Sequence, residues 1–348
     1  MGLAFIYRCS VNYMRYRLYR ISRFFGIRLY PYPFLAVINL TSRCNLKCDF
    51  CTAYKGNKTN KHVHMSMSDF RFILRELKKN NFCVITFSGG EPLLNKNVYK
   101  FAEMARKKGF FVNLSTNGVL AADQDVAKNI AGYFDAVRIS LHATGKNLDK
   151  VTGGKNVYDS VVKGLDNLRK FSSKIQVGLN IVIFNQDKHE LQKIIRDTEN
   201  KVDFYAFLPE FSFYQSEEFS IKVKNYERMF NELYSNRNII HNRNFLRKYS
   251  LKHSKKICDA GKLYLMFTPD GNIYACPFIS QNDSNLLGNV NSREKLRKIL
   301  SRNVFKDFSR HCTGCYSSCT TDVSEVFRSN PLFLLKDNIN KFIMLLKK

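Results

Sequence analysis

Short apolar runs alternate with segments of helical periodicity from Phe34 to about Pro209. The apolar runs have the length and the β-branched and aromatic content of buried strands, and the segments between them repeat apolar residues at the spacing of one helix face. Strands are predicted at 35–40, 84–87, 110–114, 136–141, 175–183 and 204–208, with helices at 68–79, 98–107, 124–131, 158–171 and 188–197. This alternation requires parallel strands with crossover helices. It predicts an α/β fold, and the six strands favour a closed or partly closed barrel over an open sheet.

Chemically distinctive residues follow the ends of these predicted strands. Cys44 comes after the first strand, Gly89 after the second, and Thr116 and Asn117 after the third, while Ser140 closes the fourth. The carboxyl ends of parallel barrel strands form one face of the barrel, where active sites lie. We therefore expect these side chains to share one site.

The chain changes character after the sixth strand. Residues 212–256 are polar and helical without strand signals, and the segments 263–268 and 272–276 flank Pro269-Asp270-Gly271 as a tight hairpin. The tail that follows is short and loop-rich, and so small a unit gains most of its stability from a bound metal. The predicted parts are an amino-terminal arm (1–33), a barrel (34–211), a helical linker (212–256), a cysteine-rich unit (257–325) and an amphipathic, basic-ended helix (326–348).

The amino-terminal arm is cationic. No Asp or Glu precedes Asp49, whereas arginines recur from Arg8 to Arg28. A helical projection gathers one set of apolar residues on one side: Leu3, Tyr7, Met14, Leu18, Ile21 and Phe25. This pattern is typical of a helix on an anionic membrane surface and equally of a helix docked on its own domain. Because arginines interrupt the apolar stretches, neither a signal peptide nor a spanning helix is expected, which favours a cytoplasmic location, with peripheral contact at the inner face of the membrane left open.

Composition narrows the class of protein. Hydrophobic residues make up 45% of the 348, which argues against disorder, and the formal net charge of +27 favours an anionic partner such as nucleic acid, a phosphorylated substrate or an acidic membrane. The chain has ten cysteines. In a reducing compartment clustered cysteines indicate metal binding and not disulfides. Cys9 and Cys83 stand apart from the clusters and are expected to be small packed side chains.

The first cysteine cluster occupies one loop after the first strand. Cys44, Cys48 and Cys51 offer three thiolates, which suits an iron–sulfur cluster with one iron left without a protein ligand. A zinc site is the alternative, with His62 or His64 as the fourth ligand.

A glycine-rich segment follows the second strand. Its sequence is Ser88-Gly89-Gly90-Glu91-Pro92, in which the two glycines allow a close backbone approach to a ligand and Glu91 offers an acceptor for an ammonium group.

Together, the CxxxCxxC triplet and the Gly-Gly-Glu-Pro segment resemble the signature of the radical S-adenosylmethionine (SAM) superfamily over roughly residues 34–209. The resemblance implies a partial (β/α)6 TIM-like barrel in which the three cysteines hold a 4Fe–4S cluster whose open iron chelates SAM. It also implies SAM contacts for Phe50, Gly89, Gly90, Glu91, Pro92, Thr116, Asn117 and Ser140. For Asn117 a simple turn, and for Ser140 a satisfied strand hydroxyl, remain alternatives.

The second cysteine cluster resembles the SPASM and twitch extensions of the same superfamily. Cys258 and Cys276 bracket Gly271 with the family's spacing, and the later Cys312 and Cys315 complete four ligands. The resemblance implies one auxiliary 4Fe–4S cluster, for which Cys319 is a surplus ligand that could replace Cys312 or Cys315 or stay free. A structural zinc fits the same four thiolates.

The resemblance implies an enzyme that reductively cleaves SAM to a 5′-deoxyadenosyl radical and abstracts hydrogen from a substrate carbon. Flavodoxin or ferredoxin would suit as electron donor, and no residue can be assigned as a general acid or base. The charge favours an anionic sugar- or lipid-linked substrate. A peptide-modifying maturase is the alternative, disfavoured because the arm before Phe34 is short and basic for a peptide-binding domain. A metal-stabilised nucleic-acid-binding protein would leave the segment 89–92 unexplained, so a nucleic-acid partner is not expected.

Overall fold

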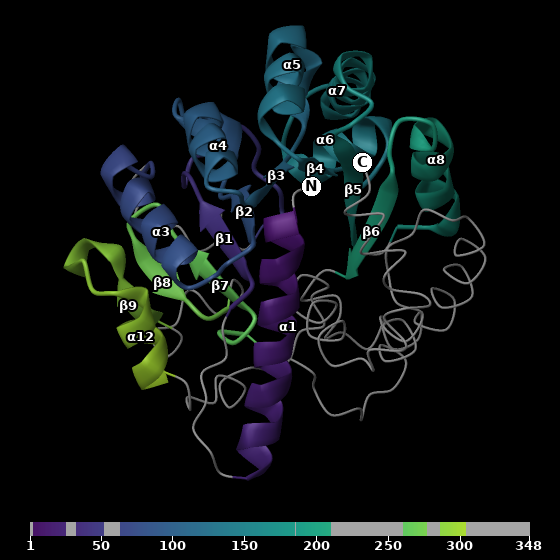
Figure 1. The fold of residues 1–348 in the computed structure, drawn as a ribbon. Helices are drawn as coiled ribbons and strands as arrows, with labels where there is room; N and C mark the ends of the chain where they lie inside the picture. Colours follow the sequence, from purple (N-terminus) through teal and green to yellow (C-terminus); the bar gives the residue numbers. More distant parts are fainter. Residues whose placement is uncertain are drawn as a thin grey trace.

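The computed structural model describes residues 3–25, 33–51, 63–184, 186–209, 260–276 and 286–303. These residues contain one nine-stranded sheet with the order β6-β5-β4-β3-β2-β1-β7-β8-β9 (Figure 1). Its first six strands are β1 (Leu35–Asn39), β2 (Val84–Ser88), β3 (Phe111–Thr116), β4 (Ala136–Ser140), β5 (Gln176–Ile183) and β6 (Phe204–Pro209). Each pairs in parallel with the next along the chain, whereas β1 and β6 are not neighbours. The prediction of a partial α/β barrel is therefore confirmed.

Helices connect the parallel strands and line up along one face of the sheet (Figure 1). Those predicted from periodicity are α3 (Met67–Lys79), α4 (Val98–Lys107), α5 (Gln124–Tyr133), α7 (Val157–Phe171) and α8 (Lys188–Thr198). The sequence pattern does not predict α6 (Gly145–Thr152), which is eight residues long and ends at Gly153 with φ +60°. So short a helix has too few turns to give a periodic pattern of apolar residues. The glycine that ends it adopts a left-handed backbone conformation that other residues avoid.

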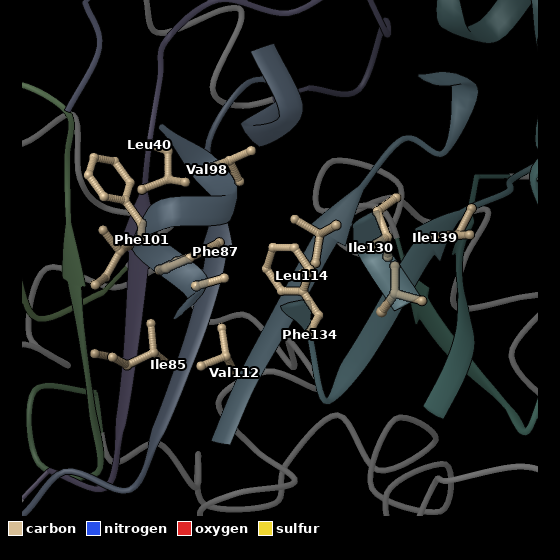
Figure 2. Close-up of a cluster of buried hydrophobic side chains, with 14 of the residues drawn as sticks. Leu40, Ile85, Phe87, Val98, Phe101, Val112, Leu114, Ile130, Phe134 and Ile139 are labelled. Carbon is tan, nitrogen blue, oxygen red and sulfur yellow. The ribbon is translucent and has the colours of Figure 1, made fainter. Parts of the chain in front are cut away.

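The main core lies between the sheet and these helices. Along β2, Ile85 and Phe87 are buried while the alternate residues are only half-buried, so the strand's helix-facing side is the apolar one. Figure 2 shows these two side chains in the same buried cluster as Phe101 of α4 and Leu114 of β3. Phe101 stacks on Phe70 of α3 with ring centroids 4.2 Å apart. The apolar layer fixes the strands and hence the position of their carboxyl ends.

The predicted hairpin of the cysteine-rich unit is present and joins the same sheet. Strand β7 (Tyr264–Phe267) pairs in parallel with β1 and antiparallel with β8 (Asn272–Tyr274), which pairs with β9 (Leu286–Asn289). Gly271 adopts φ +86° in the turn, and its N–H donates to the Thr268 carbonyl at 2.9 Å. Short 3-10 turns η1 (Pro92–Leu94), η2 (Val119–Ala122) and η4 (Val290–Ser292), together with helix α12 (Leu296–Asn303), complete the described elements. The hairpin can extend the barrel sheet because β6 does not pair with β1, which leaves one edge of β1 open for β7.

The arm forms helix α1 (Leu3–Phe24), which is docked on the barrel. Tyr16 and Tyr19 are buried, and the Asn12 amide Nδ2 donates to the Asn81 carbonyl at 2.6 Å and to Cys83 Sγ at 3.2 Å. Cys9 and Cys83 are packed side chains, as expected: Cys83 is buried and Cys9 packs against the same cluster. Their thiols hydrogen-bond each other between α1 and the start of β2. Docking thus uses the tyrosine and asparagine side of the helix and not the apolar side seen in the sequence.

Within the described residues, no helix is both long and apolar enough to cross a membrane. The predicted linker at 212–256 and terminal helix at 326–348 lie outside the described residues, and the domain boundaries stay predictions.

Replacing Phe101 with alanine should lower the free energy of unfolding by about 3–5 kcal/mol, since it empties a fully buried aromatic site. The matched change Phe25→Ala, at a side chain that is 68% exposed, should cost no more than about 0.5 kcal/mol. Urea unfolding followed by circular dichroism measures both. Equal losses would contradict the assignment of the core.

Candidate active site

The carboxyl ends of β1 and β2 are joined backbone to backbone. The Gly90 N–H donates to the Thr41 carbonyl and the Glu91 N–H to the Arg43 carbonyl, each at 2.8 Å. A Cβ on Gly89 would lie 2.4 Å from the Thr41 oxygen, and one on Gly90 2.2 Å from the Arg43 oxygen. The close approach that these glycines permit is therefore to the segment leading into the cysteine loop. They fix the cysteine loop relative to Glu91.

Glu91 is fully buried where β2 and β3 end. Its Oε1 accepts from the Leu93 N–H at 3.1 Å and the Thr116 hydroxyl at 2.8 Å, and its Oε2 accepts from the Asn117 N–H at 2.9 Å. Burial raises the pKa of Glu91 to about 7, against the lowering effect of these donors. None of the ion pairs in the described part of the chain includes Glu91. A buried carboxylate with hydrogen-bond donors but no cation fits the ammonium group of a ligand. Pro92 follows it, buried at the first position of η1.

Asn117 connects the third strand to the cysteine loop. Its Nδ2 donates to Asn45 Oδ1 at 2.7 Å and lies 3.8 Å from Cys44 Sγ, while its Oδ1 accepts from the Val119 N–H at 3.1 Å. Asn117 therefore closes a turn, as the simpler interpretation holds, and also contacts the cysteine loop. Gly118 follows with φ +79°, and a Cβ there would lie 2.5 Å from Ile139 Cγ2.

The three cysteines lie in one loop that is anchored on α6. The Lys47 N–H donates to the Thr152 carbonyl at 2.8 Å, and the Asp49 N–H to the Val151 carbonyl at 3.1 Å. Burial, together with repulsion from Cys51 and Cys44, raises the pKa of Cys48 to about 12. Burial also raises the pKa of Cys44. Deprotonating these cysteines therefore costs free energy unless a bound cation neutralises the thiolates.

Three thiolates in one loop suit an iron–sulfur cluster that has one iron without a protein ligand. One zinc would need every ligand about 2.0–2.3 Å away. An iron–sulfur cluster instead takes each thiolate at a different iron. His64 is exposed beside the backbone of Thr41, and His62 lies outside the described residues.

Phe50 belongs to an aromatic group at the ends of β4 and β5. Its ring meets that of His142 edge-on at 4.9 Å and stacks on Phe184 at 5.7 Å. Burial lowers the pKa of His142 to about 3, and its Nδ1 accepts from the Val182 N–H at 3.0 Å, so the ring is neutral with its proton on Nε2. Sequence reasoning missed His142, although it follows a strand end as the other site residues do.

Ser140 lies half-buried at the end of β4, in register with Asn180 of β5. Among the described residues its hydroxyl has no hydrogen-bond partner in the structure, which leaves it available to a ligand.

Cys276 is the described member of the second cysteine cluster. It is buried after β8 and packs with Tyr264 and Leu35, at the amino-terminal end of β1. Cys44 follows the other end of β1, a strand of five residues, or roughly 17 Å. Cys258, Cys312, Cys315 and Cys319 lie outside the described residues, so the auxiliary ligand set stays a prediction.

Two family models match the chain. Residues 38–198 match the Radical SAM superfamily, and residues 258–321 match SPASM, an iron-sulfur cluster-binding domain.

Curated relatives match over different lengths. The Fe-coproporphyrin III synthase of Methanosarcina barkeri is 33% identical over 161 residues, which cover 46% of this chain but only 39% of that protein. The mycofactocin maturase MftC of Mycolicibacterium smegmatis is 23% identical over 304 residues, covering 82% of this chain and 75% of that protein. Among solved structures, Streptococcus suis SuiB bound to its precursor peptide SuiA is similar in fold, with a TM-score of 0.65 at 16% identity, over 84% of this chain and 69% of that one.

Affinity for SAM should fall as the pH drops below about 7, because a protonated Glu91 no longer attracts an ammonium group. From pH 8 to pH 6 the loss should approach about tenfold in wild type, whereas Glu91→Gln should bind more weakly and with a flat pH profile. Anaerobic equilibrium dialysis of the reconstituted protein measures this, with Glu103→Gln on α4 as the matched control. A pH dependence that persists in Glu91→Gln would contradict the assignment.

Proposed function

The chain belongs to the radical SAM superfamily and carries a SPASM domain, and from this premise we propose that it is an enzyme that modifies a peptide by hydrogen abstraction. Its cofactors are a SAM-binding 4Fe–4S cluster, SAM itself and iron–sulfur in the SPASM domain. The observation that carries the chemistry is the buried Glu91, which has no ion pair with any described residue and is fixed next to a three-cysteine loop.

Each site residue has a role in this proposal. Cys44, Cys48 and Cys51 would hold the cluster, and Glu91 would hold the SAM ammonium group. When bound, reduced cluster and SAM together supply a 5′-deoxyadenosyl radical that removes one hydrogen atom from a substrate carbon. Asn117, bonded to Asn45 and close to Cys44, would keep the loop in register with the third strand. Phe50, backed by His142 and Phe184, would give the adenine an apolar wall.

A peptide substrate replaces the sugar- or lipid-linked substrate that the sequence alone favours. The maturase relative aligns over 82% of the chain, whereas the porphyrin-synthase relative aligns over 46%. The short, basic arm does not exclude a peptide, because a surface of high positive charge serves an acidic peptide as well as a phosphorylated sugar. Since the chain is an enzyme of this superfamily, the nucleic-acid-binding hypothesis is set aside. A reductant is required, and flavodoxin or ferredoxin is the proposed donor.

Deuterium transfer can identify the substrate class. Reduced enzyme is incubated with SAM and an extract, peptides and small molecules included, of cells grown in fully deuterated medium, and the 5′-deoxyadenosine is analysed by mass spectrometry. We expect deuterium in the 5′-deoxyadenosine, and we expect a protease pretreatment of the extract to abolish it. The Glu91→Gln enzyme should transfer little, and Glu103→Gln should match wild type.

Transfer that survives protease but disappears after organic extraction or phosphatase treatment would overturn the peptide proposal and restore a lipid-linked or phosphorylated substrate. The absence of any 5′-deoxyadenosine would contradict the radical chemistry itself.

A further inference from the structure

Helix α1 exposes an apolar stripe on the outside of the molecule. Within the described part of the chain, all the exposed large hydrophobic side chains belong to this helix or to the residue directly after it: Tyr7 (70% exposed), Met14 (57%), Leu18 (52%), Ile21 (54%) and Phe25 (68%). Single exposed apolar residues are ordinary, whereas a contiguous set usually marks a contact surface.

The stripe lies opposite the side by which α1 docks. At 100° per residue, Met14, Leu18 and Ile21 fall on one side of the helix, and Asn12 and Tyr16 fall on the other. The docked side is anchored by Asn12, whose amide reaches Asn81 and Cys83, and by Arg8, which donates to the Gly109 carbonyl. Turning the helix to bury the stripe would break these contacts. The barrel therefore holds the stripe outward.

The charge along the helix has one sign. Arg15 and Arg17 lie on its two flanks by helical position, and no acidic residue precedes Asp49. The whole chain carries a formal net charge of +27. An apolar stripe bordered by arginines is the pattern of helices that lie in the headgroup region of an anionic bilayer.

We propose that α1 binds an anionic phospholipid surface through Tyr7, Met14, Leu18, Ile21 and Phe25 and so places the barrel at the membrane. The helix lies on the bilayer and does not cross it, in keeping with the arginines along its length. A second copy of the chain is a poorer occupant, because paired stripes would bring arginines of like charge together. The inference is independent of the substrate proposed above.

Vesicle flotation of the anaerobically reconstituted full chain tests this surface. Wild type should float with vesicles that contain phosphatidylglycerol and remain unbound with vesicles of phosphatidylcholine alone. The double change Leu18→Gln/Ile21→Gln should weaken binding by about tenfold or more, since it removes apolar area from the interface. Arg17→Gln should weaken binding more than Lys128→Gln, which removes the same charge from exposed α5. SAM binding by each variant checks that the barrel is intact.

Failure of wild type to float, or equal flotation with both kinds of vesicle, would overturn the proposal. So would a wild-type dimer that becomes monomeric in Leu18→Gln/Ile21→Gln, because the stripe would then be an interface between copies. None of these outcomes bears on deuterium transfer to 5′-deoxyadenosine.

Discussion

The site depends on burying one carboxylate that has no cation beside it among the described residues. Ionised Glu91 is stabilised by donors from Leu93, Thr116 and Asn117, yet burial still raises its pKa to about 7. The same donors tie the end of β2 to the end of β3, and the neighbouring glycines tie β2 to the cysteine loop. The stabilisation of this one buried negative charge thus holds together the carboxyl ends of β1, β2 and β3. A cationic ligand would neutralise the charge, which is why this arrangement suits SAM.

Strand β1 links the two iron–sulfur regions of the chain. On one side it pairs with β2, whose end carries Glu91, and on the other with β7 of the SPASM hairpin. Cys44 follows its carboxyl end, and Cys276 packs at its amino end. The open barrel makes this arrangement available, because a closed barrel would occupy that edge of β1 with β6. The extension is therefore built onto the catalytic sheet and not merely tethered to it.

The sequence was enough to predict the barrel and to place the candidate site residues at its strand ends, since alternating βα units bring strand ends together wherever the strands are parallel. It could not predict what depends on packing between distant segments. Gly89 and Gly90 look like a ligand loop in the sequence, and only the structure shows that they make room for Thr41 and Arg43. His142 lacks a motif, and α1 docks through polar and aromatic residues that periodicity does not single out. Cys9 and Cys83 are 74 residues apart and become neighbours only on folding.

The central claim is that Cys44, Cys48 and Cys51 hold the cluster that cleaves SAM. The most direct measurement is anaerobic reconstitution with iron and sulfide, followed by iron analysis and detection of 5′-deoxyadenosine after dithionite and SAM are added. Wild type should contain about eight irons per chain, and Cys48→Ala should lose the 5′-deoxyadenosine that Cys276→Ala still forms. Zinc at both cysteine groups, or SAM cleavage that persists in Cys48→Ala, would contradict the account.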